Sequence, residues 1–304
     1  MTVHGAGTRA RQGRVARWIL PLIVGVAAWL GMMLVLYPSI AAWFSAYNQS
    51  LVIGTYMQQS EVGLEPSAAE QLRLARAYNT ELSSGALLAA NERLPQGEGT
   101  SSSTGPTYEE LLRADASGVM GRLRVPTADV DLPIYHGTSD EVLLEGVGHL
   151  EGTSLPVGGE DTHSVLTAHR GLASAKMFTD LNLVQVGDTF TITVFDQVLT
   201  YQVSEIKVVD PTETETLRQV PGEDLVTLVT CPPLGINSQR ILVTGTRILP
   251  TPPADQVAGS TVPSPLTFPW WAVIAAVGTA LVVVYVWRAT RSRPRRGAAD
   301  ATTE

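Results

Sequence analysis

The sequence Thr227-Leu228-Val229-Thr230-Cys231 ends in the only cysteine of the 304 residues, and Pro232-Pro233 follow it directly. From Asp224 to Cys231, side chains of the two faces alternate with the period of a β-strand. The two prolines remove two backbone donors and therefore end the strand. A single cysteine excludes an intramolecular disulfide, so Cys231 is either a small buried side chain or a reactive thiol.

Charge is distributed unevenly along the chain. Residues 1–38 carry four arginines and no acid, whereas residues 288–304 carry five arginines and two acids. The middle, residues 39–267, carries 12 basic and 27 acidic residues, a net charge of −15. Nucleic-acid binding needs a basic face, so this middle segment is not expected to bind nucleic acid.

Two uncharged apolar runs, residues 18–38 and 268–287, flank the acidic middle. Each has about 20 residues, enough to cross the hydrocarbon core of a membrane as a helix. A cleaved secretory signal is the alternative for the first run, but the run is long and Ser39–Ala42 is a poor cleavage site. Arginines lie on the distal side of both runs, so the positive-inside rule predicts cytoplasmic tails at 1–17 and 288–304 and an extracellular middle.

Residues 39–114 are expected to form extracellular helices and a loop. The helix of the first apolar run should continue to about Gln59, and a second helix is predicted from Ser67 to Asn91. Ser67 is its expected N-cap, with Glu70 as the partner in a capping box. Residues 95–106 have the composition of a loop, and Tyr108–Leu112 should form a short helical turn.

Residues 115–250 have the pattern of a mainly β domain. Turn residues separate eight short runs typical of strands, which predicts an antiparallel barrel or sandwich. Phe195–Val198 is expected to form a tight hairpin, and the proline-rich residues 251–267 a semi-extended linker. The predicted strands are 121–125, 130–134, 164–168, 189–195, 198–203, 207–209, 225–230 and 241–249.

Three predicted strand ends carry chemically active side chains. His169 follows one strand, Cys231 ends another, and Arg240 opens the next strand after an eight-residue loop. If the last two strands are antiparallel neighbours, Cys231 and Arg240 share one rim, where His169 can join them. A thiolate nucleophile, an imidazole acid–base and a guanidinium for developing negative charge suit acyl transfer through a thioester.

A structural role is the alternative for each of these three residues taken alone. The competing side chains in the same domain are His136, His149, His163, Arg170 and Arg247. A metal site is not expected, because there is one cysteine and no two histidines share a ligand spacing, and no cofactor is implied.

At these residues the chain resembles the sortases, the cysteine transpeptidases of Gram-positive surfaces. The family's Thr-Leu-x-Thr-Cys strand end is here Thr227–Cys231, its later arginine is Arg240, and its histidine segment is Ala168-His169-Arg170-Gly171. The wider match is similar to class C, the pilin-assembling sortases, for which a second, C-terminal membrane span is also typical. It includes Leu132–Gly137, Gly148–Pro156 and Lys176–Leu181.

The resemblance implies a sortase-type eight-stranded β-barrel with N-terminal helices and two flanking transmembrane helices. It implies that Cys231 is the nucleophile, His169 the general acid and base, and Arg240 the stabiliser of substrate and oxyanion. Thr230 and Leu228 are expected to help line the substrate site. The implied substrate is a Leu-Pro-x-Thr-Gly sorting signal on a pilin or surface protein, cleaved between Thr and Gly. A pilin lysine would accept the acyl group.

Two departures from class C stand out. Ser238-Gln239 replace the usual Thr-His before the arginine, and residues 85–115 lack the lid's Asp-Pro-aromatic motif. Leu94-Pro95 begins like a sorting signal. One hypothesis is therefore an uncleavable pseudosubstrate loop, with Glu92 or Glu98 near Arg240. The alternative is an ordinary proline- and glycine-containing linker.

Three other functions stay open at this point. Housekeeping sortases use a cell-wall peptide amine as the acceptor in place of a pilin lysine. In a cysteine hydrolase, water would resolve the acyl-enzyme. A surface module without activity would simply bury Cys231.

Overall fold

The computed structural model of the chain describes residues 7–61, 64–82, 107–114, 118–210, 215–230, 239–263 and 268–291, with the side chains of these ranges except those of residues 7–18, 61 and 215. The chain divides into two compact units. The first comprises residues 1–40 and 267–304, and the second comprises residues 41–266.

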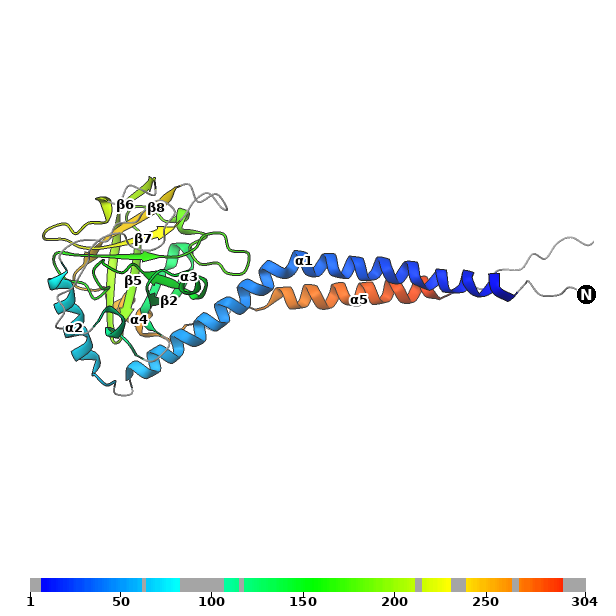
Figure 1. The fold of residues 1–304 in the computed structure, drawn as a ribbon, viewed down its shortest axis with the longest axis horizontal. Helices are drawn as coiled ribbons and strands as arrows, with labels where there is room; N and C mark the ends of the chain where they lie inside the picture. Colours follow the sequence, from blue (N-terminus) through cyan, green and yellow to red (C-terminus); the bar gives the residue numbers. More distant parts are fainter. Residues whose placement is uncertain are drawn as a thin grey trace, which may run out of the picture. The chain divides into compact units, whose positions relative to one another are not determined.

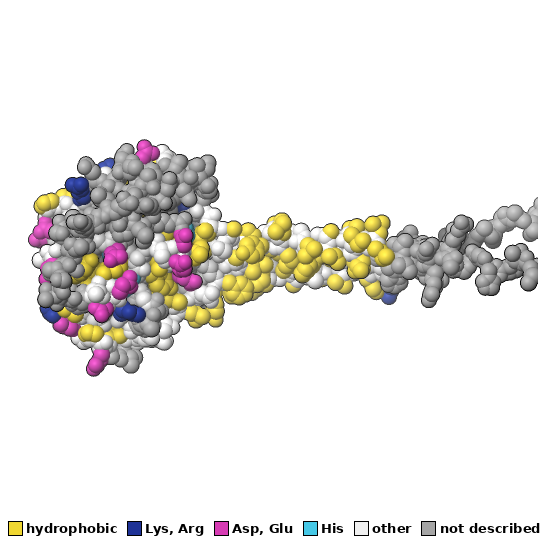
Figure 2. All heavy atoms as spheres, in the orientation of Figure 1, with side chains coloured by type: hydrophobic (Ala, Val, Ile, Leu, Met, Phe, Trp, Pro, Cys, Tyr) yellow, Lys and Arg dark blue, Asp and Glu magenta, His cyan; other side chains and the backbone are white. Residues whose placement is uncertain are grey.

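The first unit contains two apolar helices that run side by side (Figure 1). They are the first part of α1 (Gly7–Glu61) and the whole of α5 (Trp270–Thr290). Both are long and apolar enough to cross a membrane, in agreement with the two predicted spans. Figure 2 shows hydrophobic side chains along the outer surface of this pair.

Small and polar side chains bring the two helices together. The indole N–H of Trp29 donates a hydrogen bond of 3.1 Å to the hydroxyl of Thr279. Two glycines lie near this bond, and a Cβ on either would force a side chain of the other helix to shift. A Cβ on Gly25 would lie 2.6 Å from a methyl group of Val286, and one on Gly278 would overlap Met32. Close backbone approach at small residues is a common way for apolar helices to pack.

The second unit is built on a closed eight-stranded barrel (Figure 1). Around it the strands follow the order β1-β2-β3-β4-β7-β8-β6-β5. The pairs β2–β3 and β4–β7 are parallel, and the other neighbours are antiparallel. The strands are β1 (Val119–Val125), β2 (Val130–His136), β3 (Val147–His149), β4 (Thr162–Thr167), β5 (Thr189–Val194), β6 (Gln197–Val209), β7 (Asp224–Thr230) and β8 (Arg240–Ile248).

The barrel confirms the predicted fold class but corrects two strands. The predicted strands 198–203 and 207–209 are one strand, β6, whose pairing with β8 shifts register between Val203 and Glu205. A single-residue shift reverses which side chains face inward, so the sequence pattern breaks there although the strand continues. The three-residue β3 was not predicted, because it is too short to show alternation. The expectation of purely antiparallel pairing was also wrong.

The predicted hairpin at Phe195–Val198 and the predicted helical turn near Tyr108 are confirmed. Phe195 and Asp196 form the two-residue turn between β5 and β6, and Phe195 has a positive φ of 54°. The barrel interior is filled by apolar side chains of all the long strands. The shorter elements are η1 (Tyr108–Glu110), η2 (Pro126–Ala128), α3 (Asp140–Glu145), η3 (Leu181–Leu183) and η4 (Glu215–Leu217).

The helix α2 (Ala68–Glu81) begins where predicted and ends earlier. The Ser67 hydroxyl accepts a hydrogen bond of 3.3 Å from the Glu70 amide, as an N-cap should. The Glu70 carboxylate pairs with Arg73 instead of completing a capping box. The expected end at Asn91 is wrong, because Leu82 is already extended. The apolar face Leu72, Ala75, Tyr78 and Leu82 is buried as expected.

The segment after β8 is not a semi-extended linker. It contains α4 (Pro253–Ser260), which packs against β5 and β6. Proline suits the first helical positions, where its missing N–H would have no partner in any case, so the proline-rich composition was misleading here.

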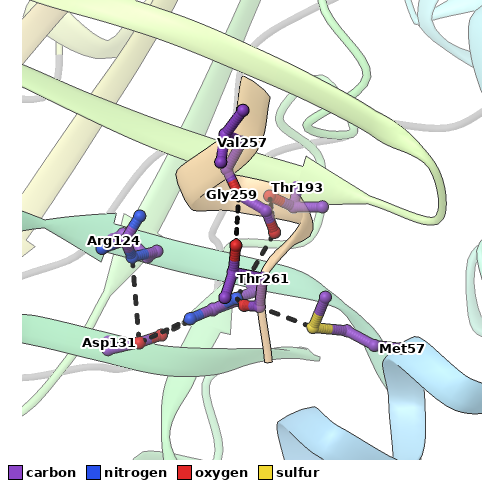
Figure 3. A network of polar contacts seen from close by, with 8 residues as sticks. Met57, Arg124, Asp131, Thr193, Val257, Gly259 and Thr261 are labelled. Carbon is purple, nitrogen blue, oxygen red and sulfur yellow. Dashed lines mark hydrogen bonds and ion pairs between the residues drawn. The ribbon is translucent and has the colours of Figure 1, made fainter. Parts of the chain in front are cut away.

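One buried arginine fastens this segment to the barrel. Arg122 on β1 is 2% exposed, and two of its N–H groups donate to the Asp131 carboxylate at 2.6 Å each. Its remaining nitrogen donates to the carbonyls of Gly259 at 3.3 Å and Thr261 at 2.7 Å. Figure 3 shows Asp131, Gly259, Thr261 and Met57 of α1 gathered around this point. The barrel, α1 and the segment after β8 therefore meet at one side chain.

Candidate active site

The strand registers bring the three predicted strand ends to one edge of the barrel. β4 runs parallel to β7 with Thr167 opposite Val229. β7 runs antiparallel to β8 with Thr230 opposite Ile241. The last residues of β4, the last residue of β7 and the first residues of β8 therefore lie together.

His169 and Arg240 are among the described residues and lie at this edge. His169 is the second residue beyond β4, and Arg240 is the first residue of β8, opposite Val209 of β6. Both side chains are half-buried. Cys231 directly follows Thr230, the last residue of β7, but lies outside the described residues. The lid candidates Glu92, Leu94, Pro95 and Glu98 also lie outside them.

Two hydrogen bonds join the segment before His169 to the end of β7. The Ala168 amide donates to the Val229 carbonyl at 3.2 Å. The Thr230 hydroxyl donates to the Ala168 carbonyl at 3.1 Å. Thr230 and Ala168 are both buried, so these bonds are shielded from water. They hold the residue before His169 against the residue before Cys231.

Hydrogen bonds join the start of the loop after His169 to residues further along the same loop. The Phe178 amide donates to the His169 carbonyl at 2.9 Å, and Phe178 is fully buried. Arg170, one of the competing arginines, donates to the Thr179 carbonyl at 3.2 Å and to the Asn182 side chain at 2.8 Å. Arg170 is therefore a structural residue of this loop, and the loop holds the backbone of His169 in place.

The competing histidines are all engaged inside the protein. His136 directs both ring nitrogens at backbone carbonyls, those of Gly118 at 3.1 Å and Leu111 at 2.8 Å. The Nε2–H group of His149 donates to the Ser154 carbonyl at 2.9 Å, which leaves Nδ1 to accept from the Tyr108 hydroxyl at 2.9 Å. Complete burial lowers the pKa of His149 to about 4.

The third competing histidine, His163, lies in a polar chain that crosses three strands. Its Nδ1–H group donates to the Arg218 carbonyl at 2.8 Å, and its Nε2 accepts from the Thr227 hydroxyl at 2.7 Å. The Thr244 hydroxyl lies 2.9 Å from that of Thr227. Burial lowers the pKa of His163 and favours this neutral form. The chain links β4, β7 and β8, the strands whose ends form the candidate site.

The remaining competing arginine, Arg247, is a structural residue near the far end of β8. Its guanidinium lies 5.5 Å from the centre of the Tyr201 ring and 3.9 Å from the Asp224 carboxylate. Its side chain is 10% exposed. Of the two competing arginines and Arg240, only Arg240 lies beside the end of β7.

Thr230 and Leu228 are described, and each is fully buried. Leu228 belongs to the main apolar core. The hydroxyl of Thr230 is used to hold Ala168. That they contact substrate stays a prediction, and the geometry gives Thr230 a supporting role in addition. Within the part of the chain that the structure describes, no three His, Cys, Asp or Glu side chains gather in a way that could hold a metal ion.

The sequence did not reveal the polar chain through Thr227 or the closed loop after His169. Threonine is common in strands for its shape alone, so Thr227 and Thr244 gave no signal of a network. The ties of Arg170 to Thr179 and Asn182 depend on how the loop folds back, and no periodic pattern records that.

Comparison with known proteins gives a consistent result. A family model described as the sortase domain matches residues 123–248, which include β8 and most of β1. Sortase A of Streptococcus agalactiae is 30% identical over 116 residues, covering 37% of this chain and 47% of that protein. The chain therefore spans about half the length of this relative.

Solved structures match over nearly their whole length. Sortase C-1 of Actinomyces oris is 48% identical, with a TM-score of 0.53, and the match covers 60% of this chain and 99% of that one. Sortase C-1 of Streptococcus pneumoniae is 42% identical, with a TM-score of 0.56 and coverage of 65% and 98%. A Streptococcus pneumoniae sortase C studied for its pilin substrate specificity is 40% identical, with a TM-score of 0.56 and coverage of 66% and 98%. With the barrel, its strand ends and these identities in agreement, the chain belongs to the sortase family and groups with the class C sortases.

Proposed function

We propose that the protein is a membrane-anchored cysteine transpeptidase that cleaves a Leu-Pro-x-Thr-Gly sorting signal between Thr and Gly. The observation that carries the proposal is the meeting of three strand ends. β7 ends one residue before Cys231, parallel to the strand that leads to His169 and antiparallel to the strand that Arg240 opens.

In the first half of the reaction, Cys231 and His169 act together. The Cys231 thiolate attacks the threonine carbonyl carbon, a carbon–sulfur bond forms, and the carbonyl electrons move onto oxygen. When the carbonyl re-forms, the bond to the glycine nitrogen breaks. The His169 imidazolium gives its proton to that nitrogen. The products are a thioester on Cys231, a free glycine amine and a neutral His169.

In the second half, an amine replaces the sulfur. A neutral amine attacks the thioester carbonyl and gives its proton to His169 as the carbon–nitrogen bond forms. The carbon–sulfur bond then breaks, which restores the Cys231 thiolate and the His169 imidazolium. One amide bond is exchanged for another, so the reaction needs no cofactor.

Arg240 is assigned to the negative charge of both tetrahedral intermediates. A guanidinium stays protonated throughout and presents several donors in a fixed plane, so it can hold the oxyanion and a substrate carbonyl together. The position of Arg240 at the start of β8, next to the last residue of β7, supports the choice of Arg240.

The proposed acceptor is a lysine of a pilin, which would make the enzyme a pilus polymerase. The support is the identity to sortase C structures, one of which was studied for its pilin substrates. Attachment to a cell-wall peptide and hydrolysis by water are the alternative outcomes, because the acyl-enzyme is common to all three.

The proposed topology places the catalytic domain outside the cell. Residues 18–38 and 268–287 would be transmembrane helices, with cytoplasmic tails at 1–17 and 288–304. Outside the membrane would lie the helices and lid-like loop of 39–114, the barrel of 115–250 and the connection of 251–267. The distribution of arginine beyond both apolar runs supports this orientation.

The test uses the full chain in lipid nanodiscs with a Leu-Pro-x-Thr-Gly peptide and either a lysine-containing pilin fragment, a cell-wall peptide amine or no amine. Mass spectrometry of the products separates the three outcomes. We expect ligation to the pilin lysine, and no product from Cys231→Ala or His169→Ala. Cleavage that persists in Cys231→Ala would refute the mechanism.

A further inference from the structure

The second half of α1 contacts the loop that holds His169. Gln49 on this helix is 9% exposed, and its side-chain amide donates to two other segments of the chain. One hydrogen bond, of 3.2 Å, goes to the Glu145 carbonyl at the end of α3. The other, of 3.6 Å, goes to the sulfur of Met177 in the loop after His169.

Met177 is held in a conformation that the backbone does not favour. Its φ is +42°, a region that side chains other than glycine, asparagine and aspartate rarely occupy, and its side chain is 2% exposed. Such a residue keeps its geometry only when the surrounding structure holds it. Gln49 is one of the groups that hold it, because its amide donates a hydrogen bond to the Met177 sulfur.

Met177 is connected to His169 through one residue. Phe178 follows it, and the Phe178 amide donates to the His169 carbonyl at 2.9 Å. A shift of Met177 therefore moves the donor that fixes the backbone of His169. The path from Gln49 to His169 consists of contiguous contacts and one peptide link.

Gln49 lies on a face of α1 that docks firmly on the barrel. Ile53, one turn further on, is 1% exposed, and Tyr56 is 2% exposed. The Tyr56 hydroxyl donates to the Met120 carbonyl at 3.0 Å and accepts from the Phe195 amide at 2.8 Å. Gln49 therefore acts from a fixed helix, which is what a positioning contact needs.

We propose that Gln49 is a positioning residue for His169, acting through Met177 and Phe178. The helix that begins as the first apolar span then also supports the general acid–base. This inference rests on the proposed function, because it assigns His169 its catalytic role. A misplacement on the order of 1 Å in a catalytic group can cost ~100-fold in rate.

The experiment compares Gln49→Met with Ser50→Ala in the full chain in lipid nanodiscs. Methionine keeps the volume of glutamine and removes the amide donor. Ser50 lies next to Gln49, and its hydroxyl donates to the Tyr47 carbonyl of the same helix, so Ser50→Ala is the matched control. The measurements are kcat and KM for peptide ligation and the midpoint of thermal unfolding.

We expect Gln49→Met to lower kcat about tenfold with KM within about twofold of wild type, because the change acts on the position of His169. Ser50→Ala should match the wild type. Should Gln49→Met misfold, Met177→Leu offers a second removal of the same contact and should lower kcat with KM unchanged.

Two results would overturn the inference. One is a wild-type kcat in Gln49→Met and Met177→Leu. The other is a loss of kcat only in proportion to the loss of folded protein. Activity in His169→Ala would instead refute the proposed function, so the two failures can be told apart.

Discussion

The Thr230 hydroxyl donates a hydrogen bond of 3.1 Å to the Ala168 carbonyl, and this bond joins the residues that precede Cys231 and His169. The bond joins the last residue of β7 to the residue that follows β4, and these two strands run parallel. Both partners are buried, so water cannot replace the bond when it is broken. Together with the bond from the Ala168 amide to the Val229 carbonyl, this bond ties the residue before His169 to the last residue of β7.

Thr230→Val should separate these two groups without changing the shape of the core. Valine keeps the volume but leaves the Ala168 carbonyl without this donor. We expect a loss of about 1–2 kcal/mol in the free energy of unfolding and a fall of about fivefold in kcat. Urea unfolding and peptide ligation measure the two effects.

Thr191→Val is the matched control. Thr191 lies on β5, and its buried hydroxyl has no hydrogen-bond partner in the part of the chain that the structure describes. Its replacement should leave activity unchanged and stability equal or higher. Equal behaviour of the two valine variants would contradict the role given to Thr230.

Arg240 and Arg247 provide a second comparison, because they lie near opposite ends of β8. Lysine keeps the charge at either position but loses the planar fork of donors. We expect Arg240→Lys to lower kcat about 100-fold at unchanged stability. Arg247→Lys should lower the free energy of unfolding by about 1 kcal/mol, because it loses the stacking on Tyr201, and keep its kcat.

Kinetics and thermal unfolding of both lysine variants test this assignment. A large kcat loss in Arg247→Lys, with little in Arg240→Lys, would show that the roles are exchanged.

The part of the fold that the sequence predicted is the part recorded in side-chain periodicity. Strand β7 shows a clear alternation from Asp224 to Thr230, and the apolar face of α2 has helical spacing. β3 has three residues and shows no period, and the bulge in β6 makes one strand read as two. Proline at the start of α4 was interpreted as a linker.

Some residues of the candidate site were predictable from the sequence and others were not. The places of His169 and Arg240 at strand ends were predictable from strand alternation, and their catalytic roles stay predictions. Gln49, which donates to Glu145 and Met177, was not predictable from the sequence. These contacts depend on the docking of a helix against loops about 100 or more residues away in the chain, and no local pattern encodes that.

His149 should make the stability depend on pH. Its pKa is about 4 in the folded protein, because burial disfavours the charged ring, against 6.5 for an exposed histidine. Between these values the unfolded chain binds a proton that the folded chain does not, so stability falls as pH drops from 6.5 to 4. The contribution lost is about 3 kcal/mol.

Urea unfolding of the wild type and His149→Gln at several pH values measures this loss. Glutamine does not titrate and can donate to the Ser154 carbonyl, so its stability should vary less with pH in this range. Identical slopes in the two proteins would exclude His149 as the source.

Asp131 should be more important for stability than its neighbour Asp129. Asp131→Asn leaves the buried Arg122 without a countercharge, and we expect a loss of about 2 kcal/mol, reduced because Asp131 is 35% exposed. Asp129 is 89% exposed and pairs with Lys176, so Asp129→Asn should cost less than about 1 kcal/mol.

Limited proteolysis adds a second measurement for Asp131→Asn. Since Arg122 also holds the carbonyls of Gly259 and Thr261, a weakened Arg122 should expose residues 250–263 to cleavage. Cleavage there at the wild-type rate, together with wild-type stability, would show that Arg122 does not need Asp131.

Gly25 and Gly31 both lie on the apolar part of α1, and they differ in how close α5 comes to them. A Cβ on Gly25 would press against Val286 of α5 at 2.6 Å, whereas one on Gly31 would meet nothing within 4 Å. Gly25→Leu should therefore push α1 and α5 apart, and Gly31→Leu should not.

The measurement is the cross-linking of Trp29→Cys to Thr279→Cys in nanodiscs with a short reagent that joins two thiols, in a Cys231→Ala background. We expect Gly25→Leu to lower the cross-linking yield about fivefold and Gly31→Leu to leave it unchanged. Equal yields in the two leucine variants would mean that the helices do not pack through Gly25 in the bilayer.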